Sequence, residues 1–196
     1  MKNYEKNQFV PAKDASSALQ AAAELILKSV GEKLGREGIE RTPQRFAKAM
    51  QEICSGYQLT ASDAVGEGIF PGEGGLVSVR DIEFFSLCEH HMLPFWGRIN
   101  VAYLPAEKIL GLSKIPRLVE VFAKRLQVQE RLTREIAEGI VETVAPKAVV
   151  VRATGSHLCM MMRGVRKTGS ETITEFSIGL DTLPPEQAAR LWKSVE

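Results

Sequence analysis

Residues 76–88, LVSVRDIEFFSLC, followed by residues 98–105, RINVAYLP, decide the fold class. Both stretches are rich in β-branched and aromatic residues, a composition that favours strands. After them the spacing of apolar residues predicts two helices, and further strands precede a closing helix. These later elements are expected over residues 116–126, 132–140, 148–154, 156–163, 171–179 and 184–195. Two strands, two helices and again strands form an α+β pattern, because a parallel sheet would show strict alternation of strand and helix.

Two helices are predicted upstream of these strands. Ser16 or Ser17 is expected to cap the first, and the second is expected to begin with Thr42 as its cap and Pro43 as its first residue. The glycines of residues 66–75 predict a loop that separates the helices from the strands. We therefore expect one domain, with a loose arm over residues 1–14, a helical region over residues 15–66 and a main region over residues 75–196.

The composition excludes several classes of protein. Apolar residues make up 44% and charged residues 25% of the 196 residues, as in ordinary globular domains. A net charge of +1 argues against nucleic acid as a partner. No apolar stretch approaches the roughly 20 residues of a membrane span, and residues 1–14 contain no apolar segment typical of a secretion signal. We expect a cytoplasmic protein without a membrane partner.

Five of the six cysteines and histidines lie in two short segments. The first contains Cys88, His90 and His91, and the second contains His157 and Cys159. The C-x2-H spacing of Cys88 and His91 suits one metal ion, and a strand over 156–163 would point His157 and Cys159 to the same face. A Cys-His-Cys set leaves tetrahedral zinc one open position, which is typical of a catalytic site. The alternative is a buried Cys159 that packs as a small hydrophobe, with histidines that only satisfy loop hydrogen bonds. Cys54, which is alone on an apolar helix face, is expected in the core.

These residues together predict zinc-assisted hydrolysis. Zinc lowers the pKa of a bound water from about 15.7 to about 7. His90 and His157 remain outside the ligand set and can transfer protons near neutral pH. Basic side chains close in sequence are candidates to bind phosphate, although a solvated charged surface is the alternative for each. They are Lys114, Arg117, Arg163, Arg166 and Lys167. Glu130 is, on composition alone, a favourable acid in the first turn of a helix.

Four motifs in one order resemble the GTP cyclohydrolase I family. They are RTPQRFAKAM (41–50), CEHH (88–91), GLSKIPRLVEVFAKRLQVQERLT (111–133) and SHLCMMMRGVRK (156–167). The resemblance extends from about residue 41 to residue 179. It implies the tunnelling fold, in which subunits with a ββααββ antiparallel sheet and two helices join around a ring. Two such rings stack into a homodecamer whose active sites lie between subunits.

The resemblance also implies a role for each matching residue. Cys88, His91 and Cys159 match the zinc ligands, His90 and His157 match the proton-transfer histidines, and Glu130 matches the carboxylate that anchors guanine. The positions that match triphosphate and ribose contacts are Arg45, Lys48, Ser113, Lys114, Arg117 and Arg163. The implied reaction is hydrolysis of GTP at C8 with release of formate, then ribose rearrangement and closure to dihydroneopterin triphosphate. This is the first step of tetrahydrofolate or tetrahydrobiopterin synthesis.

Three other classes of protein fit the sequence less well. A structural zinc module would need a fourth ligand, and the remaining cysteine, Cys54, lies on an apolar helix face. A nucleobase deaminase would show H-x-E with P-C-x-x-C, and the chain contains neither. A different tunnelling-fold enzyme, acting on another pterin or a deazapurine, would share the fold and the glutamate. The complete Cys-His-Cys set argues against it.

Overall fold

The computed structural model describes residues 14–72 and 74–196, so the predicted arm over residues 1–14 lies outside the described residues except for its last position. The helices are α1 (Ala15–Ser29), α2 (Thr42–Ile53), α3 (Ala61–Val65), α4 (Lys114–Ala123), α5 (Gln129–Val144), α6 (Leu158–Met161) and α7 (Pro185–Lys193), with short 3-10 helices η1 (Ser55–Gln58) and η2 (Leu180–Thr182). The strands are β1 (Ile69–Pro71), β2 (Val77–Cys88), β3 (Pro94–Leu104), β4 (Lys108–Leu110), β5 (Leu126–Gln127), β6 (Ala148–His157) and β7 (Thr172–Ile178). Among the described residues, none of the helices combines the length and the apolar composition needed to cross a membrane.

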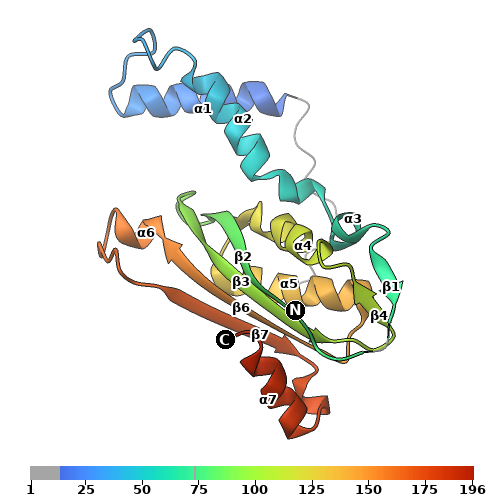
Figure 1. The fold of residues 1–196 in the computed structure, drawn as a ribbon. Helices are drawn as coiled ribbons and strands as arrows, with labels where there is room; N and C mark the ends of the chain where they lie inside the picture. Colours follow the sequence, from blue (N-terminus) through green and yellow to red (C-terminus); the bar gives the residue numbers. More distant parts are fainter. Residues whose placement is uncertain (1–13, 73) are drawn as a thin grey trace.

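The main sheet has five strands in the order β5-β2-β3-β6-β7 (Figure 1). All pairings are antiparallel except that of β2 with the two-residue strand β5. Within the described residues β7 has no neighbour on its outer side, and β5 covers only Leu87 and Cys88 of β2. The observed order of strands and helices confirms the predicted α+β class with N-terminal helices.

Helices α4 and α5 cover one face of this sheet (Figure 1). Leu132, Ile136 and Ile140, spaced four residues apart on α5, are fully buried against it, as their spacing predicts. On the sheet, Ile99 and Val101 of β3 are equally buried, because alternate side chains of a strand point to the same face. Each such side chain contributes about 1.5–3 kcal/mol through the hydrophobic effect. This layer fixes the beginning of α5 over the end of β6.

Helix α7 covers only one end of the opposite face. Its Leu191, with Val195 behind it, packs on Ala102 and Val150 in a second, smaller core. Among residues 14–72 and 74–196, no other element covers the remainder of that face, and Phe85 of β2 is 70% exposed there. The sheet therefore has one closed side and one that is mostly accessible in a single protomer.

The two N-terminal helices pack on each other and extend away from the sheet (Figure 1). The predicted caps are wrong in detail. Helix α1 already begins at Ala15, and Ser17 lies inside it with its hydroxyl donating to the Asp14 carbonyl, 2.7 Å away. Helix α2 takes Arg41 as its cap and includes Thr42 as its first residue. Proline fits either of the first two helical positions, because the backbone N–H that it lacks would have no partner within the helix there. The helix therefore begins one residue earlier than predicted.

Two further sequence predictions differ from the structure. Residues 158–163 do not continue the strand, because β6 ends at His157 and Leu158 to Met161 make the single turn α6, in which Leu158, Met160 and Met161 are good helix formers. Residues 66–75 are not entirely loop, since β1 pairs with β4 in a separate two-stranded sheet.

Candidate metal centre and active site

Three ligand atoms meet at the end of β2. One atom each from Cys88, His91 and Cys159 lie within 4.8 Å of one another. Cys88 is the last residue of β2, and its amide and carbonyl bond to Leu93 and Met92 to form the turn that carries His91. Met92 adopts a left-handed conformation with φ of 51°, which helps to reverse the chain within so few residues. Cys159 comes from α6, some 70 residues later in the chain.

The chemistry of these three donors fits a zinc ion. Two thiolates and one imidazole are typical of zinc, and three protein ligands leave one tetrahedral position open. Burial, together with the nearby Cys88, raises the pKa of the Cys159 thiol. Two adjacent thiolates are therefore unfavourable without a cation to compensate them. The predicted ligand group is thus assembled, and its donor set suits a metal.

His157 reaches this region in a way that the sequence analysis did not predict. The expectation that His157 and Cys159 share one face of a strand is wrong, because His157 ends β6 and Cys159 lies on α6. The imidazole stacks on Phe95 with ring centres 4.7 Å apart and planes 5° apart, and its Nε2 lies 2.8 Å from Oε1 of Gln129. Burial lowers the pKa of His157, although the charge of Glu130 opposes the shift. This shift favours the neutral form of the ring.

His90 lies beside the metal ligands and is largely exposed. Its Nδ1 is 3.7 Å from Sγ of Cys88, and its Nε2 is 3.9 Å from a carboxylate oxygen of Glu89. Glu89 also forms an ion pair with Arg131, which lowers the pKa of that carboxyl. Arg131 in addition donates to the Leu126 carbonyl and to the Gln127 side chain, so it connects the first turn of α5 to the turn that carries His90.

The predicted substrate-binding residues fall into two groups. Glu130 in the first turn of α5 and Arg163 after α6 lie at the end of the sheet that carries the cysteines, and Nη1 of Arg163 is 3.3 Å from Nε2 of His91. The others are located elsewhere in the protomer. Ser113, Lys114 and Arg117 are at the start of α4, whose length of about 15 Å separates them from β5 and Cys88. Arg45 and Lys48 are on α2 in the helical extension.

Sequence reasoning missed Gln129, Arg131, Glu89 and Phe95. Gln129 is only 1% exposed, and a buried amide must find hydrogen-bond partners. The sequence indicates a role for Gln129 only through its position beside Glu130 at the start of a helix. A glutamine at such a position is equally typical of the protein surface.

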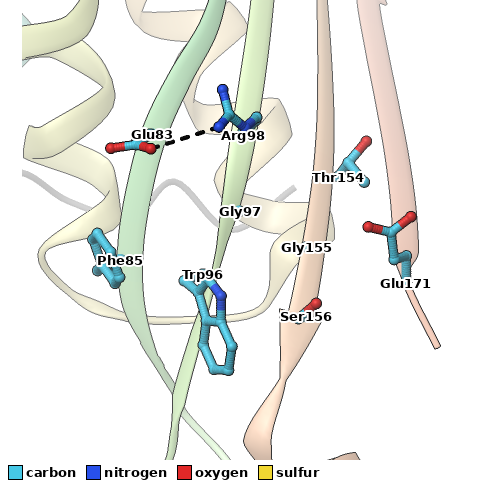
Figure 2. Close-up of a pocket in the computed structure, with 9 residues that line it drawn as sticks. All are labelled: Glu83, Phe85, Trp96, Gly97, Arg98, Thr154, Gly155, Ser156 and Glu171. Atoms are coloured by element: carbon cyan, nitrogen blue, oxygen red, sulfur yellow. Dashed lines mark ion pairs between the residues drawn. The ribbon is translucent and has the colours of Figure 1, made fainter. Parts of the chain in front are cut away.

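A separate hollow of about 300 Å³ lies on the open face of the sheet (Figure 2). Phe85 and Trp96, which are paired across β2 and β3, line it together with Arg98, and Nη2 of Arg98 is 3.7 Å from Glu83. Figure 2 shows these side chains on the face opposite α5, so the hollow is distinct from the metal-ligand group.

Comparison with known proteins assigns the family. The sequence profile of GTP cyclohydrolase I matches residues 19–195. The chain belongs to the GTP cyclohydrolase I family. Membership in the GTP cyclohydrolase I family confirms the predicted enzyme class, and the ββααββ order confirms the predicted tunnelling fold.

Curated relatives named GTP cyclohydrolase 1 match most of the chain. The Deinococcus radiodurans protein is 48% identical over 188 residues, covering 95% of this chain and 87% of that protein. The Leptospira biflexa protein is 53% identical and the Rattus norvegicus protein 48% identical, each over 83% of this chain and over 89% and 68% of the relative. A solved structure of an archaeosine synthase QueF-like protein in the apo form aligns at 18% identity with a TM-score of 0.47, covering 55% of this chain and 97% of that one.

Proposed function

We propose that this chain hydrolyses GTP at C8, releases formate and closes the product to 7,8-dihydroneopterin triphosphate. The observation that carries the proposal is the Cys88, His91 and Cys159 group, in a member of this family, with two further histidines beside it. Two hydrolytic steps consume two waters, and ring closure releases one. The net reaction therefore consumes one water for each formate released.

The metal proposed for this group is zinc, with Cys88, His91 and Cys159 as its ligands. Zinc would supply a Lewis acid that makes water acidic enough to react near neutral pH. Burial favours the neutral form of His157, so its ring can accept a proton and return it to N7 of the purine during ring opening. His90, which is exposed beside Cys88, is the proposed group for proton transfers on the ribose side.

Glu130 is the proposed guanine anchor. A carboxylate offers two acceptor oxygens, which suit the N1 and 2-amino donors of guanine. Burial lowers the pKa of His157 and the charge of Glu130 opposes this shift, which indicates that the two side chains are close enough to contact the same bound purine. Glu130 is exposed at the start of α5, whose apolar face is occupied by the sheet, and its carboxylate is thus accessible to a ligand.

The triphosphate is proposed to bind several cations. Arg163 beside His91 is one of them, and a substrate with about four negative charges needs others. The remaining candidates are Arg45, Lys48, Ser113, Lys114 and Arg117. Because Ser113, Lys114 and Arg117 lie at the end of α4 that is away from β5 and Cys88, the proposal requires a neighbouring subunit to complete the site, as in the homodecamer that the resemblance implies.

The direct experiment is incubation of the zinc-loaded protein with GTP. Formate release and the fluorescence of the oxidised pterin should rise together, in a one-to-one ratio. Formate without a pterin would indicate that the reaction stops after ring opening, and the absence of both would contradict the proposed activity.

A further inference from the structure

The Gln129 side chain is a buried amide with all of its polar atoms in use. Its Nε2 donates to the Ala153 carbonyl at 3.1 Å and to the Thr172 carbonyl at 2.8 Å. Its Oε1 lies 2.8 Å from Nε2 of His157. The amide therefore connects β6, the beginning of β7 and the histidine at the end of β6.

These contacts fix which way the amide faces. Backbone carbonyls only accept hydrogen bonds, so the NH2 group must point toward Ala153 and Thr172. A flipped amide would place Oε1 against two carbonyl oxygens. Because Oε1 carries no proton, Nε2 of His157 must donate the hydrogen bond to it. A neutral imidazole has one N–H, and Nδ1 is then the nitrogen with a free lone pair.

Two neighbours make this arrangement hard to reverse. Phe95 stacks flat on the imidazole, so rotation of the ring would break both the stacking and the hydrogen bond. Gly155 leaves the space that the amide fills, because a Cβ at this position would lie 2.5 Å from Oε1 of Gln129. Among residues 14–72 and 74–196, Gln129 is the only hydrogen-bond partner of the His157 ring.

We propose that Gln129 is a positioning residue that holds His157 in the tautomer protonated on Nε2, so that Nδ1 is the nitrogen that exchanges a proton with the substrate. The part that concerns the substrate rests on the proposed function, whereas the tautomer does not. In the proposed reaction Nδ1 takes a proton to form the imidazolium and then returns it, while the other proton stays on Nε2 of His157, hydrogen-bonded to Oε1 of Gln129. An imidazole held in the wrong tautomer cannot perform this exchange without first rotating.

The tautomer can be measured directly on the zinc-loaded protein. The chain has three histidines, so histidine-selective ¹⁵N labelling gives three pairs of ring signals in solid-state NMR of the sedimented protein. A His157→Asn variant identifies the pair that belongs to His157. We expect, at pH 8, a protonated Nε2 and a bare Nδ1. A protonated Nδ1 would overturn the proposal even if the protein turned over GTP, and the expected tautomer would stand even if it did not.

Two variants test the role of the amide. Gln129→Met keeps a side chain of similar length without the acceptor, and Gly155→Ala displaces the amide while Gln129 remains. Both should give a mixture of the two His157 tautomers and lower kcat about 100-fold, with KM within about twofold of the parent.

The matched control is Thr133→Val. The Thr133 hydroxyl donates to the backbone carbonyl of Gln129 and contacts Thr174, but does not touch the amide of Gln129. It should leave the His157 tautomer unchanged. If Gln129→Met or Gly155→Ala folds and the tautomer signals equal those of the parent, Gln129 does not position His157. If neither variant folds, the spectrum of the parent protein still decides the tautomer.

Discussion

Nη1 of Arg163 lies 3.3 Å from Nε2 of His91, although 72 positions separate the two residues in the chain. The contact places a permanent positive charge at the edge of the metal-ligand group. An anionic ligand that bound there would pair with Arg163 beside the metal-ligand group.

Removing the positive charge of Arg163 should weaken the binding of GTP but not the binding of guanosine. Arg163→Ala should cost about 1.5–3 kcal/mol in GTP binding, because one charge-assisted contact is lost. Titration calorimetry with GTP and with guanosine measures both affinities. Arg134→Ala, which removes an exposed arginine paired with Glu138 on α5, is the control and should change neither. Equal affinity of Arg163→Ala and the parent for GTP would remove Arg163 from the phosphate site.

Cys159→Ala should abolish both bound zinc and turnover, because two protein ligands hold zinc far less tightly than three. Elemental analysis for zinc per chain and the formate assay give the two readouts. Cys54→Ala is the matched control, since Cys54 is half-buried at the end of α2 and not among the three clustered ligands. One zinc per chain in Cys159→Ala would show that the metal is held by other residues.

Glu130→Gln should retain zinc and the assembly but lose most turnover of GTP. An amide presents a donor where the carboxylate presents an acceptor, so one of the two guanine donors loses its partner. The preference for GTP over ITP, which lacks the 2-amino group, should fall with it. Glu138→Gln, an exposed position on the same helix, should keep that preference. An unchanged GTP to ITP ratio in Glu130→Gln would exclude the guanine role.

The parent protein should sediment as a large ring and not as a monomer. The reason is that Lys114 and Arg117 lie at the end of α4 that is away from β5 and Cys88, so the proposed site takes them from a neighbouring subunit. Analytical ultracentrifugation combined with the formate assay checks this. Full activity in a species of one chain would show that a single protomer contains the complete site.

The short helix α3 should contribute stability that depends on pH. Hydrogen bonds from the side chain and the backbone amide of Thr60 hold the pKa of Asp63 below its usual range, in a reciprocal cap. A lowered pKa means that the stabilisation is complete above the unfolded value of about 3.9 and is lost as the pH falls through the folded pKa. Asp63→Ala should therefore unfold at a lower temperature than the parent at pH 6, and the difference should shrink below about pH 4. A difference that is constant with pH would contradict the cap.

The sequence predicted the parts of the fold that follow from periodicity. Ile136 and its neighbours at intervals of four residues had to face a sheet, and the β-branched strands around Val101 and Val150 had to be buried. The clustering of cysteines and histidines predicted the metal-ligand group, because such residues rarely gather in two short segments by chance.

What the sequence did not predict depends on contacts between distant segments. The turn α6 replaced a strand because β6 ends at His157, where pairing with β3 also stops at Phe95. The roles of Gln129 and Gly155 arise from one amide that reaches across from a helix to a sheet. Neither residue type carries a local signal for such a contact, because glutamine is common on surfaces and glycine is common in turns.

The two borders of the main sheet also affect how the protein behaves when it is handled. Among the described residues, no strand pairs with the outer side of β7 or with most of the free side of β2, so in a lone protomer these edges can pair with strands of other chains. Dissociation of the proposed ring, or partial denaturation, would therefore expose these strand edges and lead to aggregation. Heat inactivation of this protein is then expected to be irreversible, with an apparent midpoint that shifts with scan rate and protein concentration.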